Sequence, residues 1–210
     1  MDLGGLPSEP HPFAPTGPDD PRVQIMPLGA GQEVGRSCII ASYKGKTVML
    51  DCGIHPGHEG LASLPLFDQL DISCVDVCLV THFHLDHCAA VPFLIGHTDF
   101  KGRVFMTHPT KAIYRTLLTD FLKVSQGGEN QLYTEDDLNN SIELIEVIDF
   151  HQTVDIDGIR VCAYRAGHVL GAAMFMVEIA GMRILYTGDY SRVPDRHLSG
   201  ADLPPVKPHT

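Results

Sequence analysis

The stretch His82-Phe-His84-Leu-Asp86-His87 places four side chains that can bind a metal within six residues. Imidazole and carboxylate groups suit zinc and its neighbours, whereas a thiolate-rich cluster would indicate a closed structural site. The stretch follows an apolar run over 75–81 that is typical of a strand buried on both faces. In extended backbone His82 and His84 point the same way, so they can share one metal ion. Asp86 and His87 then lie past the strand end, where a second ion could bind.

Three further polar side chains follow predicted strands and stand close to glycine, which lets backbone approach a ligand closely. Asp51 or Asp189 alone is equally well explained as a turn or capping carboxylate, and His168 alone as a core histidine. Taken with the stretch at 82–87, they indicate one metal site. The three are Asp51 after the run 47–50, His168 in Gly167-His-Val-Leu-Gly171, and Asp189 in Tyr186-Thr-Gly-Asp189.

The composition fits one globular domain, with 210 residues of which 44% are hydrophobic. No apolar run reaches the roughly 18 residues that span a bilayer, and the N-terminus lacks a signal pattern, so we expect no membrane partner. Six scattered cysteines without a CxxC pair favour free thiols in a reducing compartment. The net charge of −11 repels phosphates, so we expect this chain alone to hold a long polyanion weakly.

The chain divides into a proline-rich tail over residues 1–21, expected to be disordered, and a globular part over 22–210. A helix is predicted over 109–124, with proline at its start and an apolar stripe, and a shorter helix could begin within 87–95. Strands alternating with occasional helices indicate an α/β or α+β sandwich. The predicted strands cover 23–28, 37–42, 47–51, 75–81, 143–150, 153–156, 159–165, 174–180 and 182–187.

These motifs resemble the metallo-β-lactamase superfamily, whose metal-binding motifs match in the same order along the chain. The resemblance extends to its β-CASP group, and within that group to the endonucleases of pre-mRNA 3′-end processing. It covers roughly Arg22 to the end. The segments that carry it are Pro27–Ser37, Asp51–Gly57, His82–His87, Phe105–His108, Thr110–Tyr114, Gly167–Phe175 and Asp195–Leu198.

The resemblance implies a four-layer αβ/βα sandwich with a two-zinc site between the sheets. On the matching positions, His82, His84 and His168 would bind the first zinc ion. Asp86 and His87 would bind the second, and Asp189 would bridge the pair. Asp51 would orient the ligands, so the candidate catalytic residues are Asp51, Asp86 and Asp189.

The resemblance also implies a reaction and a setting. Two such ions can stabilise charge on a scissile phosphate and lower the pKa of water. The implied function is therefore zinc-dependent hydrolysis of RNA phosphodiesters in the nucleus. Pre-mRNA would be the substrate, and the other subunits of the cleavage and polyadenylation complex would be the partners.

This sequence departs from the family pattern in two places. Ala89 stands where glycine is usual, and we expect one methyl group at a helix start to be tolerated. After Asp189 the family continues with a Glu-Ser-Thr-Tyr block, an inserted β-CASP domain and two later histidines, none of which occurs here. We therefore expect a metallo-β-lactamase domain that is incomplete at its C-terminus and weak or inactive alone.

Two other functions stay open on the sequence. One is a different hydrolase of the same fold acting on small molecules. The other is a non-catalytic short form that binds the processing complex. Among the remaining histidines, His55 and His108 could line the cleft, and the others are expected to be structural or exposed.

Overall fold

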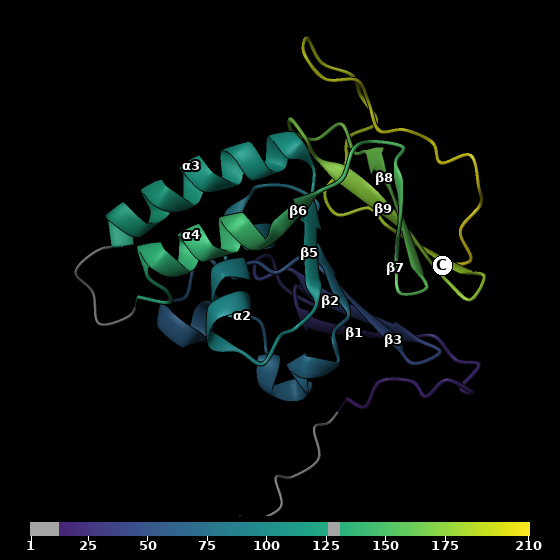
Figure 1. Cartoon of the computed structure of the whole chain (residues 1–210). Helices are drawn as coiled ribbons and strands as arrows, with labels where there is room; N and C mark the ends of the chain where they lie inside the picture. The colour runs from purple at the N-terminus through teal and green to yellow at the C-terminus, as the bar shows by residue number, and fades with distance from the viewer. Residues whose placement is uncertain (1–12, 126–130) are drawn as a thin grey trace, which may run out of the picture.

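Two β-sheets form the centre of the molecule (Figure 1). The computed structural model describes residues 13–125 and 131–210. A six-stranded sheet has the order β1-β2-β3-β4-β5-β6, and a four-stranded sheet has the order β10-β9-β8-β7. The strands are β1 Gln24–Gly29, β2 Cys38–Tyr43, β3 Lys46–Leu50, β4 Val77–Leu79, β5 Arg103–Met106, β6 Ile145–Val147, β7 Thr153–Ile156, β8 Ile159–Arg165, β9 Ala173–Ile179 and β10 Met182–Tyr186.

The first sheet changes from antiparallel to parallel pairing at β3. Strands β1, β2 and β3 pair antiparallel, and β3 to β6 pair parallel. The turn between β2 and β3 is Lys44-Gly45, with φ of 53° and 77°. Two positive φ values are the signature of a type I′ hairpin turn.

The longer helices cover the outer face of the first sheet (Figure 1). An apolar core lies between them and the sheet, and its largest fully buried side chains include Tyr114 and Leu118 of α3. The helix predicted over 109–124 is confirmed as α3. The helices are α1 Leu85–Cys88, α2 Val91–His97, α3 His108–Ser125 and α4 Glu135–Leu144, with short 3₁₀ turns η1 Gly60–Ser63, η2 Phe67–Gln69 and η3 Ile72–Cys74.

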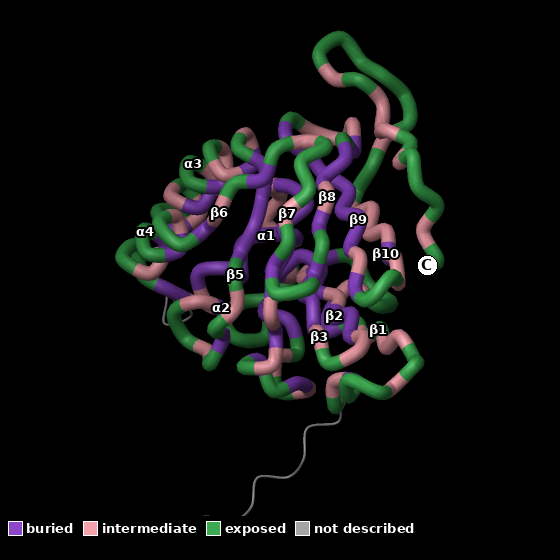
Figure 2. The backbone as a smooth tube through the Cα atoms, turned by 45° about the vertical axis from the view of Figure 1, so that its right-hand side comes forward, coloured by how far each residue is buried: buried purple, intermediate pink, exposed green. Residues whose placement is uncertain are grey.

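A second apolar core fills the space between the two sheets. Val48 and Leu79 of the first sheet and Phe175 of the second belong to this core and are almost inaccessible to solvent. Figure 2 shows the same pattern as buried segments along the central strands. The α/β sandwich predicted from the sequence is therefore confirmed as helices on one sheet that packs face to face with a second sheet. The implied four-layer αβ/βα arrangement is present in three layers, because the described residues after β6 form strands and no helix.

The parallel strands determine where the chemistry lies. Carboxyl ends of neighbouring parallel strands meet at one edge of a sheet. The chain leaving β3 at Asp51 and the chain leaving β4 toward Thr81 lie side by side there, with Asp51 N donating to Leu79 O at 2.9 Å. The chain entering β9 reaches the same edge, since Ala173 N donates to Thr81 O at 2.9 Å, and so does the end of β10, since Tyr186 OH donates to Asp51 Oδ2 at 3.0 Å.

One predicted strand is partly wrong. Residues 143–144 belong to α4, and only Ile145–Val147 form a strand. Helix α4 begins with a capping box, because the Thr134 side chain accepts from Asp137 N while the Asp137 side chain accepts from Thr134 N. This box satisfies backbone donors that would otherwise be unpaired, so the segment starts a helix. Neither this helix nor the short strand β5 was predicted from the sequence.

The end of the expected tail differs from the prediction over its described residues. Thr16 is 3% exposed, and its backbone N–H donates to Ser42 Oγ at 3.0 Å. Phe13 pairs with Leu70 in an isolated bridge. The contact of Thr16 attaches the described part of the tail to β2, where the Ser42 side chain offers a partner for the tail backbone. Residues 1–12 of that tail lie outside the described part.

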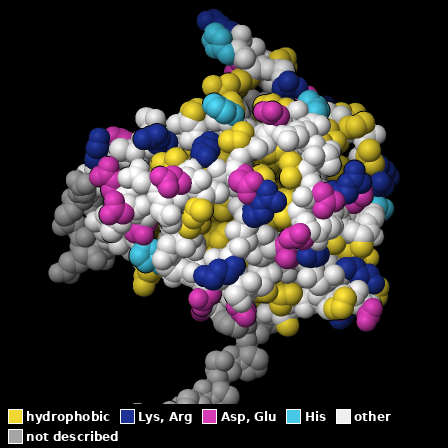
Figure 3. Space-filling view, in the orientation of Figure 1, with side chains coloured by type: hydrophobic (Ala, Val, Ile, Leu, Met, Phe, Trp, Pro, Cys, Tyr) yellow, Lys and Arg dark blue, Asp and Glu magenta, His cyan; other side chains and the backbone are white. Residues whose placement is uncertain are grey.

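The surface mixes charges of both signs. On the face drawn in Figure 3, acidic and basic side chains alternate without a large patch of either. Ion pairs on the surface include Arg103 with Glu146 at 2.6 Å and Arg160 with Glu178 at 3.1 Å. Among residues 13–125 and 131–210, no helix combines the length and the apolar character that crossing a membrane requires.

Candidate metal centre

Four side chains that can bind a metal converge at the edge where the two sheets meet. The group is His82, His84, His168 and Asp189, whose ligand atoms all lie within 4.8 Å of one another. His82 Nε2 lies 2.9 Å from His84 Nδ1, and His168 Nε2 lies 3.4 Å from the same atom. The structure thus brings together side chains that are up to 107 positions apart, 189 minus 82.

The carboxylate of Asp189 faces two sets of ligand atoms. Its Oδ2 lies 3.6 Å from His168 Nε2 and 4.0 Å from His82 Nε2. Its Oδ1 lies 3.8 Å from His87 Nε2, which in turn is 3.6 Å from Asp86 Oδ2. One oxygen therefore belongs to the group with three histidines and the other to the pair of Asp86 and His87.

Asp51 stands behind the histidines rather than among their converging atoms. It is fully buried, and its backbone adopts φ of 61°, in the left-handed region that Asp tolerates better than most residues. Its carboxylate accepts hydrogen bonds from Thr81 N at 2.7 Å, from Thr81 Oγ1 at 2.9 Å and from Tyr186 OH at 3.0 Å. His87 Nδ1 lies 2.8 Å away. These donors satisfy a buried carboxylate that would otherwise be costly.

The electrostatic environment keeps the central histidine neutral. Burial, followed by the charges of His87, His84 and His168, lowers the pKa of His82 to about 2. Burial and the neighbouring His168 lower the pKa of His84 as well. A neutral imidazole retains a nitrogen lone pair, which a metal ion requires.

The pKa values of His87 and Tyr186 are raised, in contrast to those of His82 and His84, and both side chains contact Asp51. Burial opposes a charge on His87, but its hydrogen bond to Asp51 and the charges of the nearby carboxylates outweigh burial and raise its pKa. Burial and the charge of Asp51 raise the pKa of Tyr186, so its hydroxyl stays protonated and donates.

The local backbone explains how the stretch at 82–87 reaches Asp51. Helix α1 runs alongside the segment after β3, with Cys52 N donating to His87 O at 2.9 Å and Ile54 N donating to Leu85 O at 3.0 Å. Gly53 makes this approach possible, because a Cβ there would lie 1.8 Å from Asp86 O. Glycine in the Asp51-Cys-Gly53 motif therefore serves close packing of backbone against backbone.

The donor set fits zinc ions. Zinc binds His nitrogen at about 2.0–2.1 Å, and a tetrahedral site then separates ligand atoms by about 3.3 Å. The separations of 2.9, 3.4, 3.6 and 4.0 Å around His82, His84, His168 and Asp189 bracket this value. Lone pairs that converge so closely repel one another unless a proton or a cation lies among them.

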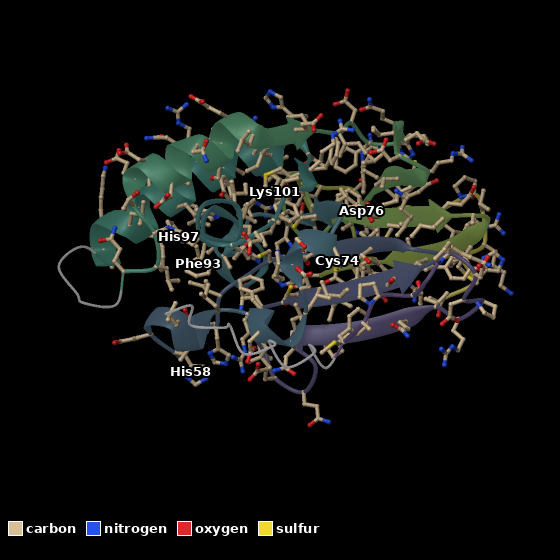
Figure 4. All side chains as sticks on the ribbon, turned by 60° about the horizontal axis from the view of Figure 1, so that its bottom comes forward. His58, Cys74, Asp76, Phe93, His97 and Lys101 are labelled. Carbon is tan, nitrogen blue, oxygen red and sulfur yellow. The ribbon has the colours of Figure 1, made fainter. Side chains whose placement is uncertain are left out.

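The other predicted histidines stand apart from this group. His55 lines a cavity of about 490 Å³ that also includes His58 and Leu85, and His108 begins α3 with an exposed side chain. Neither belongs to the converging ligand atoms. His97, labelled with Phe93 in Figure 4, stacks on that ring at 5.1 Å and pairs with Asp137.

Sequence reasoning missed two polar residues of the site, Thr81 and Tyr186. Both contact Asp51 and neither stands in a ligand position. The sequence gives little sign of their role, because threonine and tyrosine are common in strands and are ordinary residues at the end of an apolar strand.

Comparison with known proteins agrees with this geometry. The model of the metallo-β-lactamase superfamily domain matches residues 40–208. The chain belongs to the metallo-β-lactamase superfamily.

Among curated proteins, the chain is similar to cleavage and polyadenylation factors. It is 58% identical over 195 residues to cleavage and polyadenylation specificity factor subunit 3-I of Arabidopsis thaliana, covering 92% of this chain and 28% of that protein. It is 60% identical over 187 residues to cleavage and polyadenylation specificity factor 73 of Drosophila melanogaster, covering 89% and 27%. It is 55% identical over 192 residues to endoribonuclease YSH1 of Yarrowia lipolytica, covering 90% and 23%.

The chain therefore spans about a quarter of the length of these relatives. Among solved structures, a protein of unknown function from Enterococcus faecalis matches with a TM-score of 0.57 at 19% identity. That match covers 80% of this chain and 43% of the other, and at this identity it supports the fold alone.

Proposed function

We propose that this chain is the metal-binding part of a zinc-dependent RNA endonuclease that acts in pre-mRNA 3′-end cleavage and polyadenylation. The observation that carries the proposal is the convergence of His82, His84 and His168 on Asp189, with Asp86 and His87 on its other oxygen. Relatives at 55–60% identity support it, since several are named endoribonucleases and others are named cleavage and polyadenylation specificity factors.

The roles proposed for the residues follow the geometry. His82, His84 and His168 hold one zinc ion, and Asp86 and His87 hold a second. Asp189 offers one oxygen to each set, and Asp51 fixes the orientation of His87 from behind. Asp51, Asp86 and Asp189 are the proposed catalytic carboxylates. Zinc bound there would supply Lewis-acid chemistry, stabilising charge on a phosphoryl group and lowering the pKa of water.

The net charge of the chain and the share of its relatives that it matches both bear on the rate at which it would cleave RNA. The chain carries a net charge of −11, which opposes binding of a polyanion. It also matches only about a quarter of the relatives' length. We therefore propose that cleavage by this chain alone is slow. The proposed substrate is pre-mRNA, the proposed partners are other subunits of the processing complex, and the proposed location is the nucleus.

The test measures how fast the purified, zinc-loaded chain cleaves each of several substrates. We expect slow cleavage of labelled single-stranded RNA that a chelator abolishes, and no hydrolysis of a β-lactam or a thioester. The Asp189→Asn variant should lose cleavage and should bind both zinc ions more weakly, since one carboxylate serves both sets of ligands. Loss of only one ion would show that Asp189 does not bridge.

Two outcomes would replace the proposal. Hydrolysis of a thioester or β-lactam without RNA cleavage would identify a different hydrolase of this fold. Zinc binding and co-purification with the processing complex, with no cleavage of any substrate, would identify a non-catalytic short form.

A further inference from the structure

Thr81 joins a candidate metal ligand to the buried carboxylate of Asp51. Its side chain is 1% exposed and lies between the end of β4 and His82. Thr81 Oγ1 is 2.9 Å from both Asp51 Oδ1 and Asp51 Oδ2, and 3.0 Å from His82 Nδ1. The hydroxyl therefore contacts a carboxylate on one side and an imidazole on the other.

The direction of these hydrogen bonds follows from the inventory of donors. An ionised carboxylate only accepts, so the single hydroxyl proton of Thr81 is donated to Asp51. Thr81 Oγ1 is then available only as an acceptor toward the ring. The proton of a neutral His82 must consequently stand on Nδ1, and Nε2, which lies 2.9 Å from His84 Nδ1, keeps its lone pair.

The same carboxylate acts directly on His87. His87 Nδ1 lies 2.8 Å from Asp51 Oδ2, so this nitrogen donates to the carboxylate, and Nε2 is the nitrogen that faces Asp86 and Asp189. Asp51 thus reaches one histidine directly and the other through a hydroxyl group, and these two histidines face different oxygens of Asp189.

The surrounding backbone holds the Thr81 side chain in place. Thr81 N also donates to Asp51 Oδ1 at 2.7 Å. Gly188, one residue before Asp189, lies against the same side chain, because a Cβ at Gly188 would stand 2.8 Å from Thr81 Oγ1 and Cγ2. The turn that carries Asp189 therefore packs on the hydroxyl-bearing side chain.

We propose that Thr81 is a positioning residue that relays the charge of Asp51 to His82 and so fixes the tautomer in which His82 Nε2 is free to bind a metal. The inference rests on the proposed function in treating His82 as a metal ligand. The tautomer itself is a property of the metal-free chain. Partners that fix a ligand's tautomer in this way typically change metal affinity about 10- to 100-fold when removed.

The experiment measures the tautomer of His82 in the metal-free chain by long-range proton–nitrogen correlation spectra. In the wild-type chain and in Thr81→Ser, which keeps the hydroxyl, we expect the Nδ1–H form of His82. In Thr81→Val, which replaces the hydroxyl with a methyl group of similar size, we expect a mixture of both tautomers. Zinc affinity, measured by competition with a chelator, should fall about 10- to 100-fold in Thr81→Val and recover in Thr81→Ser.

Thr47→Val is the matched control. Thr47 is also a buried threonine in this sheet, and its hydroxyl contacts Ser42 Oγ at 3.3 Å, at the opposite end of β3 from Asp51. This variant should leave the His82 tautomer and the zinc affinity unchanged, so a general loss of a buried hydroxyl is separated from the relay.

Three results would overturn the inference. The first is an Nε2–H tautomer of His82 in the wild-type chain, which needs no folded variant to observe. The second is a Thr81→Val chain that keeps the Nδ1–H form and full zinc affinity. The third is a Thr47→Val chain that loses zinc affinity as much as Thr81→Val. A changed tautomer with zinc affinity unaffected even by His84→Ala would instead support the relay and contradict the proposed metal site.

Discussion

At the scale of single residues, the ring of His87 separates the two carboxylates that matter most. Asp51 lies 2.8 Å from Nδ1, and Asp189 lies 3.8 Å from Nε2. Asp51 is fully buried with several donors, whereas the Asp189 side chain is 51% exposed. A buried, satisfied carboxylate orients its neighbours, and an exposed one can meet ions and substrate.

Replacement of His84 by alanine tests the proposed ligand group. His84 Nδ1 lies within 3.4 Å of the ligand nitrogens of both His82 and His168, so its loss should abolish specific zinc uptake. Zinc per chain is measured by elemental analysis after dialysis. His97→Ala is the control, because His97 of α2 pairs with Asp137 of α4 and lies outside the ligand group. Unchanged zinc content in His84→Ala would refute the assignment.

Replacement of Tyr186 by phenylalanine tests the satisfaction of Asp51. The change removes one donor to a fully buried carboxylate, and a hydrogen bond to a charged group contributes about 1.5 to 3 kcal/mol. We expect the free energy of unfolding to fall by that amount, measured by urea denaturation. Tyr190→Phe, at a tyrosine that is 52% exposed, should have little effect. An equal loss in both variants would show that the contact with Asp51 is not responsible.

At the scale of elements, the site depends on how closely α1 approaches the segment after β3. Backbone hydrogen bonds join Cys52 to His87 and Ile54 to Leu85, and Ser37 N donates to Asp86 O at 2.8 Å. These bonds hold Asp86 and His87 beside Asp51. The helix has only four residues, so tertiary contacts rather than helix propensity hold it in place.

A methyl group at Gly53 should separate these elements. The added Cβ would lie 1.8 Å from Asp86 O and 2.4 Å from His87 N, both backbone atoms that cannot rotate away. Because overpacking costs about 1–3 kcal/mol and occasionally more, we expect Gly53→Ala to destabilise the chain by about 3 kcal/mol and to weaken zinc binding. Thermal unfolding and chelator competition measure both effects. Gly17→Ala, where nothing lies within 4 Å, serves as the control and should be neutral.

At the scale of the whole molecule, the candidate site lies where two sheets meet, beside the apolar core that fills the space between them. His82 and His84 follow β4 of the first sheet, while His168 and Asp189 follow β8 and β10 of the second. An ion bound by all four would link both halves of the sandwich. Ligands that bind only the folded state stabilise it by mass action.

Zinc should therefore raise the thermal stability of the whole chain. At a free zinc concentration of 100 times Kd, the gain is about 2.7 kcal/mol, which corresponds to a rise in Tm of about 5–10 °C for a chain of this size. Differential scanning calorimetry with and without a chelator measures it. The His84→Ala chain should show no rise. A rise of equal size in that variant would indicate zinc bound elsewhere.

The spacing of apolar residues predicts much of the fold. Strand β8 was predicted over the same residues that the structure shows, and α3 differs from its prediction by one residue at each end. Predictions failed where short elements depend on context. Strand β5 has only four residues, which is too short for a recognisable periodicity, and it was not predicted. Strand β6 follows α4 without an intervening loop, so the strand predicted over 143–150 has the wrong bounds.

The amino-acid sequence predicts the kinds of candidate ligand and their order, because a spacing of two in extended backbone already places His82 and His84 on one side. It also determined the fold class, through apolar runs of strand length. The sequence does not show that the two oxygens of Asp189 face different groups of candidate ligands, or that Thr81 and Tyr186 contact Asp51; both follow from the packing of the folded chain. Those contacts join residues up to 135 positions apart, and packing of the two sheets alone fixes such distances.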